Sequence, residues 1–147
     1  TDNEYPLIAV AGRQVYHWHT RTKTMKAPLL ADAAPRAFVA VNLMDAAELG
    51  IEDGDPVRVT SRRGSVTAPA KVGDVVAQGV VFIPFHFGEL GGGTAANDLM
   101  PKTWDPVSKQ PIQKFAAVRL ERVSGRRDPW WLDDSAPIQA ADVGGVV

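Results

Sequence analysis

The chain contains no cysteine among its 147 residues. It therefore cannot form a disulfide framework, a thiolate zinc site, a cysteine-held iron–sulfur cluster or a cysteine nucleophile. Any redox metal that works with this chain must be bound by groups other than its sulfur atoms. We expect neither a catalytic residue nor a direct metal ligand in it.

Two further features are missing, a surplus of positive charge and a long apolar run. The formal net charge is -1, whereas a general nucleic-acid binder shows a basic surplus over the whole domain. No apolar stretch reaches membrane-spanning length, and residues 1–6 lack the charged-then-apolar layout of a signal peptide. We therefore predict no nucleic-acid partner and no membrane insertion. The first residue is Thr1, and we expect the chain to be processed or cut from a longer protein.

What is present indicates one β-rich domain followed by a polar tail. Asn42 is a good N-cap and Gly50 a good C-terminal stop for one short helix between them. Apolar runs and alternating patterns predict six strands, at 7–11, 38–41, 57–60, 66–72, 80–83 and 115–123. We assign residues 1–123 to this domain. Residues 124–147, with the apolar pair Trp130–Trp131, are expected to be an extension that is partly disordered or packed on a neighbour.

The segment from Gly12 to Thr24 combines cations, hydroxyls and imidazoles without a carboxylate. Arginine and lysine supply fixed positive charge, threonine and histidine supply directional hydrogen bonds, and Trp18 offers a flat surface for a ring. Gly12 lets the backbone approach a ligand closely. Together they predict a large phosphorylated cofactor. The loop from 84 to 114 is too long for a simple connection, and it is a second candidate for ligand contacts.

Several motifs occur in the order of one known family. They are Gly12-Arg13, His17-Trp18-His19-Thr20, Pro84-Phe85-His86-Phe87, Asn97, Asp105-Pro106, Ser108-Lys109 and Lys114. Over residues 5–123 the chain resembles the C-terminal molybdopterin-dinucleotide-binding domain of the bis-molybdopterin guanine dinucleotide oxidoreductases. That group, the DMSO reductase superfamily, holds formate dehydrogenases and nitrate reductases. The resemblance implies a mainly β fold with short helices, the double-psi β-barrel also called the aspartate-decarboxylase-like barrel.

The resemblance also implies which residues contact the cofactor. They lie in three places and comprise Gly12, Arg13, Gln14, His17, Trp18, His19 and Thr20, then Phe85, His86 and Phe87, and finally Asn97 and Lys114. The implied cofactor is molybdopterin guanine dinucleotide in its bis form, with molybdenum or tungsten. An iron–sulfur cluster and the metal's protein ligand would lie in the rest of the enzyme.

Partners and activity follow from the same resemblance. It implies that this chain joins N-terminal catalytic domains of the same enzyme and an electron-transfer subunit, and that it does not catalyse alone. The whole enzyme would carry out two-electron redox chemistry, with formate oxidation as the first assignment and nitrate reduction as the alternative. The expected compartment is the cytoplasm, with the periplasm as the alternative.

Three other interpretations of the residues stay open. His17, His19 and His86 could form a zinc or copper site, although Arg21 and Lys23 would repel a cation. Gly64-Ser65 could be the processing dipeptide of a pyruvoyl-dependent decarboxylase with the same barrel, or simply a hairpin turn. The barrel could also act as a peptide-binding adaptor, which would leave the basic segment unexplained.

Overall fold

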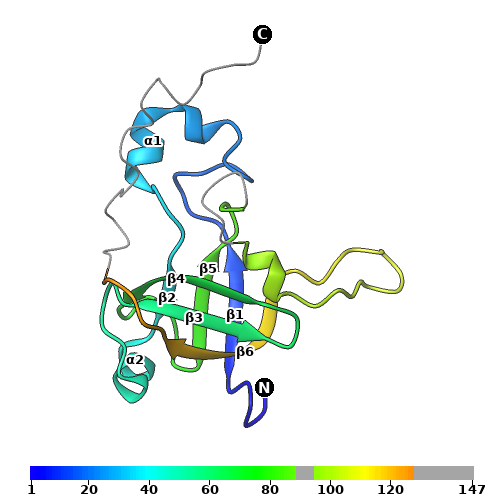
Figure 1. Ribbon diagram of the computed structural model, residues 1–147. Coiled ribbons are helices and arrows are strands. Elements are labelled where there is room, and N and C mark those ends of the chain that lie inside the picture. Colours follow the sequence, from blue (N-terminus) through cyan, green and yellow to red (C-terminus); the bar gives the residue numbers. More distant parts are fainter. Residues whose placement is uncertain (89–94, 128–147) are drawn as a thin grey trace.

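The computed structural model describes residues 1–88 and 95–127, and its centre is a closed six-stranded barrel (Figure 1). The strand order around the barrel is β1-β5-β2-β4-β3-β6. All six predicted strands are confirmed; they are β1 (Leu7–Gly12), β2 (Val39–Val41), β3 (Pro56–Ser61), β4 (Ser65–Val72), β5 (Val80–Pro84) and β6 (Phe115–Arg122). A closed barrel leaves no unpaired sheet edge.

The strand pairing identifies the barrel type. β1 pairs with β5 and β2 pairs with β4 in parallel, whereas all other neighbours are antiparallel. Exchanging β1, β2 and β3 for β4, β5 and β6 reproduces the same set of pairs. The fold is the expected double-psi β-barrel, in which two equivalent halves interlock through the parallel pairs.

The barrel interior is filled by alternate residues of each strand. Val57 and Val59 on β3 are fully buried while Arg58 between them is exposed. Small residues such as Ala9 and Ala70 are also fully buried and let the opposite walls approach. Each buried aliphatic side chain of valine size stabilises the fold by about 1.5–3 kcal/mol. The strand register is therefore fixed by this alternation.

The predicted helix is confirmed as α2 (Leu43–Leu49). The Asn42 side chain accepts a hydrogen bond from the Met44 N–H at 2.9 Å, which caps the first turn. Gly50 ends the helix in the left-handed conformation at φ 63°. Asp45 accepts the Gly79 N–H at 2.7 Å and so ties α2 to the loop between β4 and β5.

Among the described residues, three short helices were not predicted, and two of them lie between β1 and β2. They are the 3-10 helix η1 (Thr24–Lys26), α1 (Pro28–Ala33) and the 3-10 helix η3 (Ala96–Leu99). Figure 1 shows α1 at the end of the molecule opposite α2. We call residues 13–27 the arm, and the arm with α1 the lobe. None of the helices in the described residues is long and apolar enough to cross a membrane.

The chain from 101 to 114 forms a loop that projects from the side of the barrel (Figure 1). Its turn is built by Asp105, whose Oδ1 accepts the Val107 N–H at 3.0 Å, the Ser108 N–H at 2.6 Å and the Ser108 hydroxyl at 2.9 Å. These donors lower the pKa of the Asp105 carboxyl, with Ser108 as the largest cause. Trp104 and Pro111 bridge the two sides of the loop. The Asp105-Pro106 and Ser108-Lys109 motifs therefore shape the turn itself.

Candidate functional site

The candidate site lies where β1 and β5 end side by side. The two strands are parallel, and their last residues Gly12 and Pro84 are paired in register. The Phe85 N–H donates to the Gly12 carbonyl at 3.0 Å, and the Ala11 N–H donates to the Lys114 carbonyl at 2.9 Å. Three segments predicted to contact a cofactor therefore meet at this rim of the barrel.

Gly12 is required at the rim because of a close approach. A Cβ atom at this position would collide with the ring edge of Phe82 on β5. The glycine lets the two strands close together before the arm leaves the barrel. Its predicted role, to let the backbone approach a ligand, stays a prediction.

His86 joins the loop after β5 to the arm through both ring nitrogens. Its Nε2 accepts the Gln14 N–H at 2.7 Å, and its Nδ1–H donates to the His19 carbonyl. A carbonyl can only accept and an N–H can only donate, so these partners fix the tautomer. The ring is 1% exposed. Burial lowers the pKa of His86, and the positive charges of Arg13 and Arg21 lower it further, so the imidazole is neutral at neutral pH.

His17 closes the arm on itself in a similar way. Its Nε2–H donates to the Ala34 carbonyl at 2.6 Å, and its Nδ1 lies 3.1 Å from the Thr24 hydroxyl. The Thr24 hydroxyl is the donor in this pair, because the Ala34 carbonyl takes the ring's proton. Burial is the main cause that lowers the pKa of His17, followed by the charge of Arg21.

Aromatic rings and one buried guanidinium fill the space behind the arm. The centroids of His17 and His86 lie 5.8 Å apart, and His17 meets Phe87 edge-on at the same distance. Arg21 stacks its guanidinium 4.5 Å from the Phe87 ring centroid. Such a contact contributes about 2 kcal/mol when it is desolvated, and Arg21 is only 7% exposed.

The arm backbone is held in an unusual conformation. His19 and Arg21 have φ angles of 42° and 65°, in the left-handed region. For residues other than glycine this costs on the order of 1–3 kcal/mol each and persists only where the surroundings determine it. Two contacts hold this conformation. His86 donates a hydrogen bond to the His19 carbonyl, and the Arg21 guanidinium stacks on the Phe87 ring. The strained backbone therefore includes His19, a predicted contact residue, and Arg21, which directly follows Thr20.

The outer surface of the arm carries exposed donors and a flat ring. Arg13, Trp18, His19 and Thr20 are all exposed, and Trp18 meets His19 edge-on at 4.7 Å. The sequence has no carboxylate between Gly12 and Ala31. This donor set suits a large anion with an aromatic part, because cations and hydroxyls bind phosphate and an indole face stacks on a ring.

The structure distributes the predicted contact residues unequally. It brings the arm, the loop of Phe85 to Phe87 and the Lys114 backbone together at the rim, with the Arg13 guanidinium 5.9 Å from the Phe85 ring. Asn97 lies on η3, which enters the core through Ala96 and Leu99; no contact with the arm is recorded for it in the described part of the chain. The glycine run at 91–93 lies outside the described residues.

Some residues that shape the site were not predicted. Arg21 and Thr24 belong to the basic segment, but their burial and their contacts with Phe87 and His17 depend on a fold that brings distant segments together. The sequence does not predict a left-handed backbone conformation at an arginine, because glycine and asparagine are the residues that favour this conformation. The one sequence feature that pointed to Arg21 and Thr24 was the mixture of positive charge and hydroxyl groups in their segment.

The three-histidine metal site does not form. His17 and His86 use their ring nitrogens in bonds within the chain, so these lone pairs are not directed at a common metal ion. Among residues 1–88 and 95–127, no group of three histidine, cysteine, aspartate or glutamate side chains could hold a metal. Gly64-Ser65 forms the tight turn from β3 to β4, with the Gly64 carbonyl accepting the Ser61 N–H at 2.9 Å.

Comparison with known proteins agrees with this geometry. The family model described as "Molydopterin dinucleotide binding domain" matches residues 7–117. The chain is 42% identical to the F420-dependent formate dehydrogenase 2 subunit alpha of Methanococcus maripaludis over 122 residues, which are 83% of this chain and 18% of that protein. It is 41% identical to the periplasmic nitrate reductase of Desulfovibrio desulfuricans over 121 residues, which are 82% of this chain and 16% of that protein.

A solved structure is similar as well. Acetylene hydratase from Pelobacter acetylenicus superposes with a TM-score of 0.67 at 20% sequence identity, covering 82% of this chain and 19% of that one. At this identity the likeness establishes the fold alone. The chain spans less than a fifth of the length of the relatives that it matches.

Proposed function

This chain belongs to the family of molybdopterin dinucleotide-binding domains, and from that premise we propose that it is the cofactor-binding domain of a larger formate dehydrogenase-type oxidoreductase. The cofactor of the family is a molybdopterin dinucleotide. Formate is the first substrate because the relatives at 39–42% identity include three formate dehydrogenase alpha subunits. Nitrate reduction is the second candidate, supported by the 41% identity to a nitrate reductase.

The observation that carries the proposal is the arm pinned at the rim of the barrel. The side chains of Arg13, Trp18, His19 and Thr20 are all exposed, and no carboxylate occurs among residues 13–30. This donor set fits a pterin dinucleotide, which combines a fused ring system with a pyrophosphate. Arg13 and Thr20 would bind phosphate oxygens, and Trp18 would lie against a ring. Asn97 and Lys114, both exposed, are proposed as further polar contacts.

The buried members of the predicted set take a supporting role in this proposal. His17, His86 and Phe87 are at most 5% exposed, so their side chains act from behind the arm. His86 holds the Gln14 amide and the His19 carbonyl, which fixes the direction of the donors between them. A rigid second layer of this kind lowers the cost of ordering the donors when a ligand binds.

The rest of the enzyme supplies the remaining chemistry. When bound, the cofactor supplies two-electron redox chemistry through molybdenum or tungsten, which we propose is held by two pterins. The metal's protein ligand, an iron–sulfur cluster and the N-terminal catalytic domains lie outside this chain, and an electron-transfer subunit is a further partner. We propose the cytoplasm as the compartment, with the periplasm as the alternative.

The test uses the full-length enzyme that carries this domain, purified without oxygen. Arg13→Ala is compared with Arg58→Ala, an exposed arginine on β3 that pairs with Glu121 at 3.4 Å. We expect the first variant to lose molybdenum or tungsten and nucleotide by about tenfold, since a charge-assisted bond contributes about 1.5–3 kcal/mol. The control should keep both.

Elemental analysis, nucleotide release and assays with formate and with nitrate are the readouts. Formate oxidation without nitrate reduction supports the first assignment, and the reverse result supports the second. Full metal and nucleotide content in the Arg13 variant would contradict the proposed arm contact. Absence of molybdenum and tungsten from the unaltered enzyme would contradict the proposal as a whole.

A further inference from the structure

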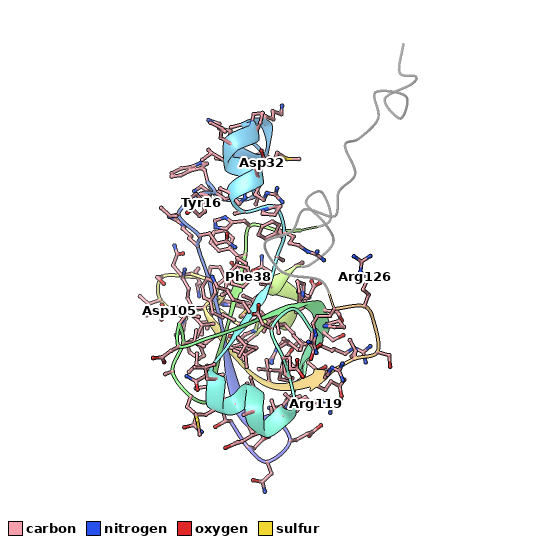
Figure 2. The ribbon with its side chains drawn as sticks, turned by 90° about the vertical axis from the view of Figure 1, so that its left-hand side faces the viewer. Tyr16, Asp32, Phe38, Asp105, Arg119 and Arg126 are labelled. Carbon is pink, nitrogen blue, oxygen red and sulfur yellow. The ribbon has the colours of Figure 1, made fainter. Side chains whose placement is uncertain are left out.

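A pocket of about 240 Å³ lies between the lobe and the barrel, on the inner side of the arm. Its walls include Val15 and Tyr16 from the arm, Pro35 and Phe38 from the segment that enters β2, and Lys71 from β4. Figure 2 shows Tyr16 on the lobe with Phe38 below it, at the upper end of the barrel. None of the exposed residues Arg13, Trp18, His19 and Thr20 lines this pocket.

The pocket combines apolar walls with hydrogen-bond donors, of which two are positively charged side chains and one is a neutral amide. The Lys71 ammonium lies 5.0 Å from the Phe38 ring centroid, and Arg36 belongs to the same wall. The side-chain nitrogen of Gln14 is buried there and has no hydrogen-bond acceptor among the described residues. A buried amide donor favours an acceptor within reach. The lining suits an aromatic ring accompanied by carboxylates.

The described chain ends in an anchor on a residue that is hydrogen-bonded to β4, the strand that carries Lys71. Arg127 donates from Nε to the buried Asp55 carboxylate at 2.8 Å and from a terminal nitrogen to Glu52 at 2.6 Å. The Asp55 carbonyl accepts the Ala70 N–H at 2.8 Å, and Ala70 directly precedes Lys71 in the pocket wall. Figure 2 places Arg126 at the same upper end of the barrel as Phe38.

The sequence that follows has the composition that the pocket fits. Residues 128–135 contain Trp130–Trp131 and three aspartates, and no lysine or arginine occurs after Arg127. An extended chain spans about 3.3–3.6 Å per residue, so Trp130 can reach about 10 Å beyond Arg127. Docking of the tryptophan pair requires the pocket to lie within that reach of Arg127.

We propose that the C-terminal extension docks onto its own domain here, with the Trp130–Trp131 pair in the pocket and Asp133–Asp134 facing Arg36, Lys71 and Gln14. The extension then braces the inner side of the arm, while the outer side stays open. The docking rests on the pocket, the Arg127 anchor and the charge pattern. It does not depend on the cofactor assignment, and it is tested without cofactor.

The absence of cysteine makes an intramolecular cross-link the sharpest test. In the complete chain, Ala33→Cys at the pocket rim is combined with Ser135→Cys in the extension, and disulfide formation is followed by mass spectrometry after proteolysis. The matched control pairs Ser135→Cys with Leu43→Cys on α2, an exposed position at the opposite end of the molecule. We expect the pocket pair to cross-link about tenfold faster or more, because docking raises the effective concentration of one thiol at the other.

Three further variants separate docking from chance encounters. Trp130→Ala with Trp131→Ala in the pocket pair should bring the rate down to that of the control pair. Lys71→Glu should slow cross-linking, and Lys71→Arg should preserve it, because only the first reverses the charge that faces the aspartates. Equal rates in the two pairs, no intramolecular cross-link, no dependence on the tryptophans, or disulfides only between two chains would each overturn the proposal.

Discussion

Replacing His86 with phenylalanine separates the hydrogen bonds of this residue from its volume. The ring keeps its place between Phe85 at 4.7 Å and His17 at 5.8 Å, but the partners at Gln14 and His19 lose their bonds. Each partly buried group left unsatisfied costs about 1–3 kcal/mol. Since both groups are only partly buried, we expect a total near the lower end, about 2–4 kcal/mol.

The loss should fall on the arm and spare the barrel. Neither bond touches the core around Val57 and Val59, which are fully buried. A cost of about 2–4 kcal/mol corresponds to roughly 30- to 700-fold faster opening, at tenfold per 1.4 kcal/mol. Hydrogen exchange of amides 14–27 should therefore accelerate by that order, while amides of β3 and β6 exchange as before. Lys23→Ala, at an exposed position on the same arm whose side chain makes no cap bond, is the control and should change neither region.

Two results would refute this reasoning. Unchanged exchange in the arm of the His86→Phe variant would mean that the arm is held by something other than the imidazole. Equal acceleration in the arm and in the barrel would mean that the two open as one unit, so that His86 has no local role. His86→Ala adds a cavity to the same losses, and it should therefore exceed the phenylalanine variant by about 1–3 kcal/mol.

Three other substitutions or conditions give measurable outcomes. Gly64→Ala would place a Cβ 2.9 Å from the Asp98 carbonyl on η3, and it should lower the free energy of unfolding by about 1–3 kcal/mol, whereas Gly73→Ala, with nothing within 4 Å, should change it little in urea titrations. Asn42→Ala removes the cap of α2 and should cost about 1 kcal/mol in the same assay; an unchanged midpoint would contradict the cap. The two buried imidazoles have pKa values below the ordinary 6.5, so the unfolded chain binds more protons, and stability should be complete above about pH 6.5 and fall as the pH drops below it. His17→Gln should reduce that loss between pH 7 and 5, and an unchanged pH profile in thermal unfolding would count against the neutral pair.

The barrel could be predicted because its signals are local. Alternation on β3, the apolar run of β1 and the Asn42 and Gly50 caps each act within a few residues, and all of them recur in the structure. The helix α1 escaped prediction for the opposite reason. It is six residues long, has no buried residue and no side-chain cap, so no apolar periodicity supported the start signal of Pro28 at its first position.

The site was predictable in composition but not in arrangement. The sequence indicated which types of side chain suit an anion, yet His17 and His86 look the same in a sequence whether they lie on a surface or behind it. Their positions depend on bonds across large separations, such as the one from Gln14 to His86, 72 residues apart. Only the closed pairing of β1 with β5 brings those residues together.

The equivalence of the two barrel halves has an architectural consequence. The connection from β1 to β2 carries the whole lobe, whereas its counterpart from β4 to β5 spans only residues 73–79. The strand pairing is nevertheless the same in the two halves. The barrel therefore tolerates very different lengths in corresponding connections, because the entropy cost of closing a loop grows slowly with its length. The loop at 73–79 is therefore a natural insertion point for protein engineering, where a second ligand-binding element could be grafted without altering the strand register.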